Sequence, residues 1–409
     1  MIKSYLIINA YSRHNLGDYA IAIAIAKEIK MQYPDSKVVI SADDYLSFEN
    51  CPFIDKVIPT LAPFDGKRLK RLTKLIVNSF IFATYRHIGK SRLLSWGATR
   101  NMLLTEILRA DRVISCGGGY LNLQSKMGVL GFLNKFLMIV FSRKFNDKTS
   151  LAAQSIGPFK SKIIEKIVVS NLTAINRIVI RDLHNFKELK HYSGLHIKHF
   201  PDAVFSLYRF VEPKDVNHTS NKGHLRIGIT VRNWWFPGFP KDSLNKYLFE
   251  VSEYIRRILT TKLMVEIYLI SQVELFNDND LEVCKLIQQE IKCDTQLRIV
   301  SLRDKNLQEV LEFYRTLDLL VGTRMHSIIF SLLVHTPVIG IAYEPKTVGL
   351  MELFGFQKFL LPIESVSADN LEMYTEQILN SNLDYKRDLS QKIQTISEQS
   401  RDGLSYVIE

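Results

Sequence analysis

Short apolar runs alternate with longer segments of helical periodicity along the 409 residues of the chain. Apolar runs bounded by turn residues are typical of strands buried in a sheet. In the first half, strands are expected at 5–10, 37–41, 111–116, 150–154, 177–180 and 196–200. In the second half, they are expected at 225–231, 264–270, 297–301, 317–321 and 338–342. Because helical segments separate the strands, the pattern predicts an α/β fold with parallel sheets.

Two further stretches interrupt this alternation and divide the chain. The stretch 43–66 contains three prolines and no clear period, so we expect it to be irregular. The stretch 208–223 is polar and predicts a linker between two domains, which a chain of this length favours. We therefore expect domains at 1–210 and 222–385, and a C-terminal helix at 386–409 that packs back onto the first domain.

The segment 317–354 carries the strongest chemical signal. Its apolar strand ends just before Thr323, which is a suitable N-cap for an apolar helix at 325–334. Arg324 and His326 then fall in the first turn of a helix beyond the C-terminal edge of a strand, where open α/β sheets bind ligands. Helix N-termini favour anions, the guanidinium of Arg324 suits a carboxylate or phosphate, and His326 can transfer a proton near neutral pH.

Two other strand ends add cations to the same expected edge. Lys346 lies in the turn after the strand at 338–342, and Arg232 directly follows the strand at 225–231. Taken singly, such cations are more often solvated surface, and a histidine in an apolar helix is more often a packed core residue. Their occurrence together at strand-to-helix turns favours a pocket for a small polyanion that undergoes acid-assisted chemistry.

Turns with glycine and acidic residues end two strands of the first half. Asp18 opens a helix after the first strand, which suits an anion or a hydroxyl group, although a helix cap is the simpler explanation. Gly117, Gly118 and Gly119 follow a later strand, where they would let a ligand approach the backbone or let elements pack closely. The three-glycine dinucleotide fingerprint is absent, so NAD and FAD are not predicted.

The amino-acid composition limits the classes of partner and cofactor that we expect for this protein. The net charge of +11 suits an anionic partner, but no helix-turn-helix, zinc-finger or RNP-type signature indicates nucleic acid. Four scattered cysteines favour a reducing, cytoplasmic setting. The sequence Asp278-Asn279-Asp280 resembles a metal-binding pair but is better explained by acids that open a helix, so we expect neither a metal nor a cofactor.

Two segments combine basic and apolar residues. At 67–86 a strongly basic end precedes an apolar and aromatic end, and at 128–144 an apolar stretch ends in basic residues. Either could lie on an anionic membrane surface, which would make the protein peripheral on the inner face of the cell membrane. The alternative is a packed core helix with an exposed basic end, which we favour for 128–144. No apolar run is long enough to span a bilayer.

A series of short motifs follows the predicted strand ends. They are Asn15-Leu16-Gly17-Asp18, Gly117-Gly118-Gly119-Tyr120, Ser155-Ile156-Gly157-Pro158, Arg181-Asp182, Pro201-Asp202, Arg232, Gly322-Thr323-Arg324-Met325-His326 and Tyr343-Glu344-Pro345-Lys346. Their order resembles that of the polysaccharide pyruvyltransferase family, from about Ile7 to about Gly355. No single motif is decisive, but Arg-x-His at a helix start followed by Tyr-x-x-Lys is fairly specific.

The resemblance implies two Rossmann-like domains in a GT-B-like arrangement, with the site in the cleft between them. It implies phosphoenolpyruvate as the donor substrate. The acceptor would be a sugar of a capsule, exopolysaccharide or other cell-surface polysaccharide, or of its lipid-linked precursor, and it would receive a pyruvate ketal. The general acid would be His326, and the donor-binding residues of the second domain would be Arg232, Thr323, Arg324 and Lys346. The acceptor-binding residues of the first domain would be Asp18, Gly117, Gly118 and Gly119.

Two alternatives remain open. Glu344 and Glu352 have the Glu-x7-Glu spacing of retaining glycosyltransferases, so a nucleotide-sugar-dependent glycosyltransferase of the same architecture is the second interpretation. Acids at this spacing on a helix are also common by chance. A third interpretation is a non-catalytic protein that binds acidic polysaccharide or anionic lipid through its basic surface. It predicts that Arg324 and His326 can be replaced without loss of function.

Overall fold

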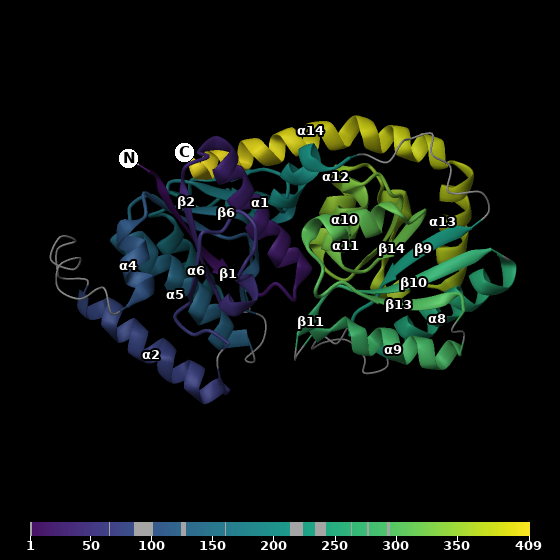
Figure 1. Cartoon of the computed structure of the whole chain (residues 1–409), viewed down its shortest axis with the longest axis horizontal. Helices are drawn as coiled ribbons and strands as arrows, with labels where there is room; N and C mark the ends of the chain where they lie inside the picture. The colour runs from purple at the N-terminus through teal and green to yellow at the C-terminus, as the bar shows by residue number, and fades with distance from the viewer. Residues whose placement is uncertain are drawn as a thin grey trace. The chain divides into compact units, whose positions relative to one another are not determined.

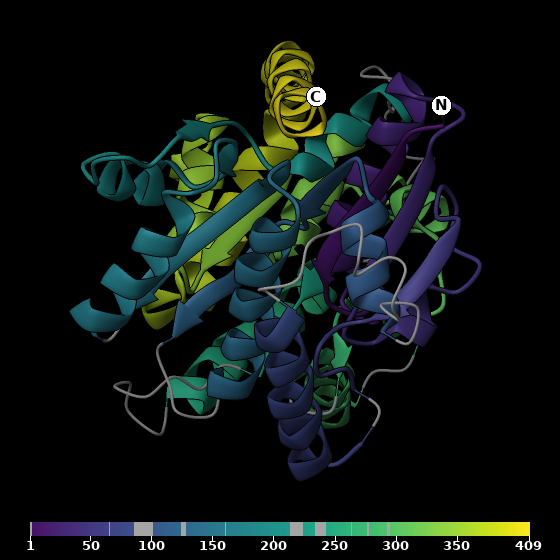
Figure 2. The ribbon, with the colours of Figure 1, turned by 90° about the vertical axis from the view of Figure 1, so that its left-hand side faces the viewer.

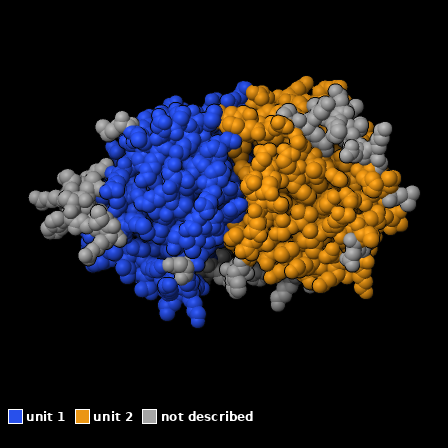
Figure 3. Space-filling model, in the orientation of Figure 1, with its two compact units in different colours: residues 1–13, 18–206, 398–409 blue, residues 14–17, 207–397 orange. Residues whose placement is uncertain are grey.

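The computed structural model describes residues 2–64, 66–85, 101–123, 128–159, 161–212, 224–233, 243–262, 264–275, 278–292 and 295–409. Contacts between residues divide the chain into two units (Figure 3). Unit 1 comprises Met1–Arg13, Asp18–Ser206 and Glu398–Glu409, and unit 2 comprises His14–Gly17 and Leu207–Ser397. Most of the expected linker, from 213 to 223, lies outside the described residues.

Unit 1 is built on a parallel sheet with helices packed against it (Figure 1). The described strands run in the order β3-β2-β1-β4-β6-β7-β8, and β5 also pairs with β6. Their bounds are β1 Ser4–Ala10, β2 Lys37–Ala42, β3 Lys56–Pro59, β4 Arg112–Ser115, β5 Gly118–Leu123, β6 Thr149–Phe159, β7 Ile178–Ile180 and β8 Ile197–His199. The described helices are α1 Leu16–Gln32, α2 Arg68–Tyr85, α4 Met102–Arg109, α5 Val129–Phe145, α6 Lys162–Leu172 and α7 Leu183–Leu189, with short 3-10 helices η1 Tyr45–Phe48 and η4 Ala203–Phe210.

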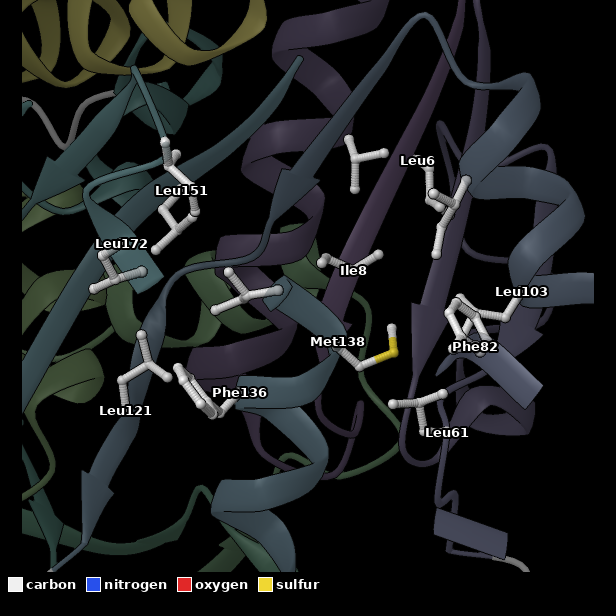
Figure 4. Packing of buried hydrophobic residues seen from close by; sticks show 14 of the residues in the cluster. Leu6, Ile8, Leu61, Phe82, Leu103, Leu121, Phe136, Met138, Leu151 and Leu172 are labelled. Carbon is white, nitrogen blue, oxygen red and sulfur yellow. The ribbon is translucent and has the colours of Figure 1, made fainter. Parts of the chain in front are cut away.

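The core of unit 1 lies where these helices cover the sheet. Leu6 and Ile8 of β1 form one buried cluster with Leu151 of β6 and with Phe136 and Met138 of α5 (Figure 4). Every residue from 5 to 8 is buried, so β1 is apolar on both of its sides, as expected for a sheet covered on both faces. Figure 2 faces unit 1 and shows helices in front of the strands. Because helices cover the faces of the sheet, we expect ligands to bind at the ends of its strands.

Unit 2 contains a second parallel sheet, with the strand order β13-β10-β9-β14-β15-β16. The strands are β9 Leu225–Thr230, β10 Val265–Ser271, β13 Leu297–Ser301, β14 Leu319–Gly322, β15 Val338–Ala342 and β16 Leu360–Pro362. A short antiparallel pair, β11 Glu274–Leu275 and β12 Asp278–Asn279, follows β10. The described helices are α8 Ser243–Thr261, α9 Asp280–Ile291, α10 Leu307–Arg315, α11 Met325–Leu333, α12 Pro345–Leu353 and α13 Ala368–Asn380, with 3-10 turns η5 Gln357–Phe359 and η6 Ile363–Ser365.

The last helix, α14 Asn382–Ile408, contributes to both units. Its final part belongs to unit 1, where Ser150 of β6 donates a hydrogen bond to the Val407 carbonyl at 2.9 Å. Arg177 donates to the Tyr406 carbonyl at 2.8 Å, and Ser400 donates to the Asp202 carbonyl at 2.8 Å. The end of the helix is therefore attached to the sheet of unit 1 by side-chain to backbone hydrogen bonds.

The predicted α/β architecture with parallel sheets is confirmed in both units, but three local predictions were wrong. The stretch 43–66 contains η1 and the strand β3, whose few apolar residues and final proline hid its signal. The glycine run at 117–119 leads directly into β5 rather than into a loop. Strand β6 continues through Gly157-Pro158, beyond the strand end that we had expected at residue 154. Glycine and proline weaken a strand pattern in sequence, yet neighbouring strands still pair there.

Candidate functional site

Three strand ends of the unit 2 sheet bring the predicted cations to one edge. Strand β14 lies between β9 and β15, all three are parallel, and Gly322 is in register with both neighbours. The chain that follows each strand therefore emerges at the same edge of the sheet. These three segments carry Arg232, Arg324 and Lys346.

The turn before α11 is supported by a hydroxyl from the neighbouring strand. The helix begins at Met325 with Arg324, not Thr323, in the N-cap position, which corrects the expected cap. The backbone N–H groups of Thr323 and Arg324 donate to the hydroxyl of Thr230 at 3.0 and 3.3 Å. The Thr323 hydroxyl is fully buried and pairs with the Tyr247 hydroxyl at 2.9 Å. Thr323 thus supports the turn from inside, because its polar groups are already bound within the protein.

Arg324 is held by two carboxylates. Asp280 accepts from its Nε at 3.1 Å and from Nη2 at 2.5 Å, and it also accepts from the backbone N–H of Val273 at 3.0 Å. Asp278 accepts from Nη1 at 2.9 Å and from Nη2 at 2.5 Å. Asp280 therefore fixes the inner side of the guanidinium. Asp278 occupies the terminal fork that is geometrically suited to a bound carboxylate or phosphate.

Arg232 and Lys346 border the same carboxylate cluster. The Arg232 guanidinium lies 3.9 Å from the Asp278 carboxylate and 4.3 Å from the centre of the Tyr343 ring. Lys346 forms an ion pair with Glu344, and its ammonium lies 6.0 Å from the centre of the same ring. We call these six residues the charged cluster: Arg232, Asp278, Asp280, Arg324, Glu344 and Lys346. Both outer cations lie over the Tyr343 ring, and Arg232 is the nearer of the two.

The pKa values of the carboxylates show that the cations act together. Burial alone would raise the pKa of Asp278, but the charge and hydrogen bonds of Arg324, followed by the charges of Arg232 and Lys346, hold it below its usual value. Burial opposes ionisation of Glu344 as well, yet Lys346, Arg232 and Arg324 together lower its pKa. Both acids therefore experience the field of the same three cations.

The pKa of Asp280 is raised instead. Burial outweighs the opposing charge of Arg324, and the neighbouring Asp278 raises the pKa further. The side chain of Asp280 is 0% exposed, whereas that of Asp278 is 32% exposed. The two acids that hold Arg324 thus differ in access, since Asp278 is partly exposed to solvent and Asp280 is not.

His326 lies against the backbone of Gly17. Both residues belong to unit 2, and a Cβ atom built on Gly17 would lie 2.1 Å from His326 Nδ1. Any side chain at position 17 would therefore displace the imidazole. The segment that carries Gly17 is held to unit 2 by backbone hydrogen bonds from Leu16 to Gln272 at 3.3 Å and from Glu274 to His14 at 3.1 Å. Gly17 thus limits where the His326 ring can lie.

The residues predicted for the acceptor meet at the strand ends of unit 1. A Cβ atom built on Gly118 would lie 3.5 Å from the Asp18 carboxylate, so these two residues are neighbours. Gly118 has φ +142°, which disfavours other residues. A side chain on Gly117 would strike the carbonyl oxygens of Ala152 and Ala153 at 2.7 Å, so Gly117 is needed for packing. Gly119 alone of the three has open space above it.

Two buried ion pairs lie at the same edge of unit 1. Arg181 donates to Asp202 at 2.6 Å and to the hydroxyl of Ser155 at 2.9 Å. Lys135 lies 3.1 Å from Asp43 and donates to the carbonyls of residues 9 and 10 at 3.0 and 2.8 Å. Arg181 and Asp202 come from two of the short motifs, Arg181-Asp182 and Pro201-Asp202. These two motifs therefore form a buried ion pair. Each pair is enclosed by the protein on both sides.

Asp278 and Asp280, which resembled a metal-binding pair, are bound to Arg324. As expected, Asp280 also opens α9, and the side chain of Asn279 caps that helix by accepting from Leu281 N–H at 3.1 Å. In the part of the chain that the structure describes, no group of three or more His, Cys, Asp or Glu residues is placed to hold a metal ion.

Comparison with known proteins places this arrangement in a family. The family model described as polysaccharide pyruvyl transferase matches residues 15–345. The chain belongs to the polysaccharide pyruvyl transferase family. The amylovoran biosynthesis protein AmsJ of Erwinia amylovora is 20% identical over 416 residues, covering 97% of this chain and 96% of AmsJ.

Solved structures share the fold of this pyruvyl transferase family member at low identity. The UDP-GlcNAc 2-epimerase of Neisseria meningitidis, solved with bound UDP-GlcNAc, has a TM-score of 0.58 at 10% identity over 99% of both chains. A glycosyltransferase from Rickettsia africae has a TM-score of 0.55 at 11% identity, covering 100% of this chain and 96% of its own. These likenesses confirm the predicted GT-B-like fold with two Rossmann-like domains.

Sequence reasoning missed several residues of the charged cluster in this family member. Asp278 and Asp280 precede Arg324 by more than forty positions, and nothing local connects them. The available signal was their place after β10, because parallel strands present their ends at one edge. Tyr343 had been noted only as part of a motif, and Gly17 had been assigned to the first domain rather than to His326.

Proposed function

We propose that this protein transfers a pyruvyl group from phosphoenolpyruvate to a sugar and forms a pyruvate ketal. The observation that carries the proposal is the convergence of Arg232, Arg324 and Lys346 on the carboxylates of Asp278 and Glu344. Phosphoenolpyruvate carries a carboxylate and a phosphate, so its site needs several cations within a short distance. His326 lies two residues after Arg324, in the first turn of α11, and supplies a group that can move a proton.

The donor must compete with Asp278. The charged cluster contains three cations and three carboxylates, so its formal charge is balanced before any substrate binds. Asp278 binds Nη1 and Nη2 of Arg324 in the two-point geometry that the carboxylate of phosphoenolpyruvate would use. Withdrawal of the partly exposed Asp278 would open this fork, while the buried Asp280 keeps Arg324 in place. Thr323 supports the turn and is not needed as a direct donor ligand.

The chemistry assigns one proton transfer to His326. Protonation of the methylene carbon of the enol forms the methyl group and leaves an oxocarbenium-like carbon. One hydroxyl of the sugar attacks that carbon, inorganic phosphate leaves, and a second hydroxyl closes the ketal ring. The two hydroxyl groups lose two protons in total, of which one balances the proton gained by the methyl group and one leaves with phosphate. The negative charge of the bound donor stabilises the charged imidazole that this step requires.

The acceptor side is proposed for unit 1. Asp18 and the open space above Gly119 suit a sugar hydroxyl, whereas Gly117 and Gly118 shape the backbone. The relative AmsJ is named for amylovoran biosynthesis, which supports a cell-surface polysaccharide, such as a capsule or exopolysaccharide, or its lipid-linked precursor as acceptor. A lipid-linked acceptor places the enzyme in the cytoplasm at the inner face of the membrane.

A thermal-shift titration tests the donor. Removal of Arg324 would leave the buried Asp280 without its partner, so the test uses Lys346→Gln at the rim of the cluster. We expect phosphoenolpyruvate to stabilise the wild type by about 2.7 kcal/mol at a hundredfold excess over its dissociation constant. The shift should nearly vanish in Lys346→Gln. The shift should persist in the control Lys262→Gln. Lys262 pairs with Glu376 and lies in the chain just before the start of β10.

The other outcomes decide among the alternatives. A shift with a UDP- or GDP-sugar and none with phosphoenolpyruvate would reject pyruvyl transfer and favour the glycosyltransferase. The structure gives that reading little support, since Glu344 is paired with Lys346 and Glu352 is exposed. Transfer activity that survives His326→Gln would exclude His326 as general acid. A purified protein that binds acidic polysaccharide but never releases phosphate from the donor would favour the non-catalytic interpretation.

A further inference from the structure

Helix α2 of unit 1 is attached along one side only. Leu75 and Phe82 are buried, and the Phe82 ring lies 5.0 and 5.7 Å from the rings of Phe141 and Phe145 in α5. Asn78 donates a hydrogen bond of 2.8 Å to a backbone carbonyl that precedes the helix. These contacts show which side of α2 faces the core. They therefore also show which residues form its opposite, outer side.

The opposite side of α2 presents large apolar side chains to solvent. Leu69 is 74% exposed, Ile76 60% and Phe80 69%, and Leu72 and Val77 are also exposed. Spacings of three and four residues place Leu69, Leu72, Ile76 and Phe80 along one face of the helix. Single exposed apolar residues are ordinary, but a continuous row of them marks an interaction surface. Figures 1 and 2 show α2 on the outside of unit 1.

Basic residues border this row, and no acidic residue accompanies it. The segment 67–85 contains neither Asp nor Glu, and its basic residues are Lys67, Arg68, Lys70, Arg71 and Lys74. Lys67, Arg68 and Lys70 are exposed, while Arg71 stacks on the Phe64 ring at 4.4 Å. A protein partner of ordinary composition would itself carry charges of both signs, and its acidic and basic groups would both need a counterpart on this surface. A surface of one sign beside an apolar row instead matches anionic headgroups above acyl chains.

The second candidate segment behaves differently. Helix α5, which covers most of 128–144, buries Phe132, Phe136, Met138 and Ile139 in the core of unit 1. It is therefore a core helix, as we had favoured. No helix in the described part of the chain is long and apolar enough to cross a bilayer. Helix α2 is thus the segment whose outer face is suited to a membrane surface.

We propose that the outer face of α2, formed by Leu69, Leu72, Ile76, Val77 and Phe80, lies in the surface of an anionic lipid bilayer. The apolar row enters the boundary between headgroups and acyl chains, and the flanking lysines and arginines bind anionic headgroups. This contact uses residues of unit 1 alone and does not depend on the transfer reaction. Only its link to a lipid-linked acceptor rests on the proposed function.

Vesicle sedimentation of the purified full chain tests this proposal. The probes are vesicles of phosphatidylcholine and vesicles of phosphatidylcholine mixed with phosphatidylglycerol, at low and at high salt. The wild type should sediment with the anionic vesicles at low salt and much less with the neutral ones or at high salt. The double variant Ile76→Glu with Phe80→Glu should weaken binding by roughly tenfold or more. Lys70→Gln should weaken it by a smaller factor and reduce its salt dependence.

A matched control is available on the same unit. Ile163 and Ile167 of α6 are exposed apolar residues one turn apart, and the double change Ile163→Glu with Ile167→Glu should leave vesicle binding unchanged. Equal losses in both double variants would overturn the proposal, as would a wild type that ignores anionic vesicles at low salt. A dimer in solution that the α2 variant converts to a monomer, without any vesicle binding, would assign the face to a second copy instead. Circular dichroism would verify that each variant is folded.

Discussion

The charged residues at the strand ends of the two units are arranged in opposite ways. In unit 1, Arg181 with Asp202 and Lys135 with Asp43 are buried pairs of one cation and one acid, enclosed by the protein. In unit 2, three cations share three acids, and one of these acids, Asp278, is partly exposed. Breaking an enclosed pair leaves a buried charge without its partner, and neither member of such a pair is exposed to a solute. We propose that the shared cluster exchanges its partly exposed member, Asp278, for a substrate anion.

The largest effect is expected from breaking an enclosed pair. Arg181→Ala leaves Asp202 charged and buried without its partner, so the free energy of unfolding should fall by about 3–5 kcal/mol. Urea denaturation measures this loss. Combining Arg181→Met with Asp202→Asn should recover part of it, because no uncompensated charge remains. A nearly unchanged stability combined with weakened donor binding would show that the pair belongs to a binding site.

A smaller effect on stability but a large one on rate is expected at Gly17. The Cβ atom of Gly17→Ala would lie 2.1 Å from His326 Nδ1, so the imidazole must move. A displacement of about 1 Å can cost roughly a hundredfold in kcat, and we expect a loss of that size with little change in KM for phosphoenolpyruvate. Steady-state release of phosphate measures both constants.

Gly131→Ala in α5 is the control for this change, because nothing lies within 4 Å of its new Cβ atom. It should keep the wild-type kcat. Full activity in Gly17→Ala would contradict the role of His326 as general acid. Equal losses in the two variants would instead indicate that any added methyl group disturbs the protein.

The smallest effect is expected from Asp278→Asn, and it tests the contrast between the two units most directly. Asp278→Asn removes one negative charge from a cluster in which cations and acids are balanced, so phosphoenolpyruvate and inorganic phosphate should both bind about five- to tenfold more tightly, roughly 1 kcal/mol. Because the cations hold the pKa of Asp278 below its usual value, its carboxylate stays charged near neutrality. The gain should therefore be the same at about pH 6 and about pH 8. Isothermal titration calorimetry measures it, and weaker binding would show that Asp278 orients Arg324 for the donor rather than competing with it.

The sequence predicted the parallel sheets and the strand ends that carry Arg232, Arg324 and Lys346, because apolar periodicity reports strands directly. It did not predict the partners of these cations. The contact of Arg324 with Asp280 joins positions forty-four residues apart, and pairing at that distance leaves no local pattern. The cap before α11 was misassigned because the Thr230 hydroxyl comes from another strand. Gly17 carried a turn signal, but only the fold reveals that His326 lies against it.

Because unit 1 includes the end of helix α14, this unit is completed only at the end of synthesis. Unit 1 is completed by Glu398–Glu409, whose hydrogen bonds reach the strand β6 and the turn at Asp202. These residues leave the ribosome only after the whole of Leu207–Ser397. The sheet of unit 1 therefore lacks this part of its cover while the chain of unit 2 is being made. Leu404, Val407 and Ile408, which are buried in the finished protein, can therefore pack only when synthesis is nearly complete.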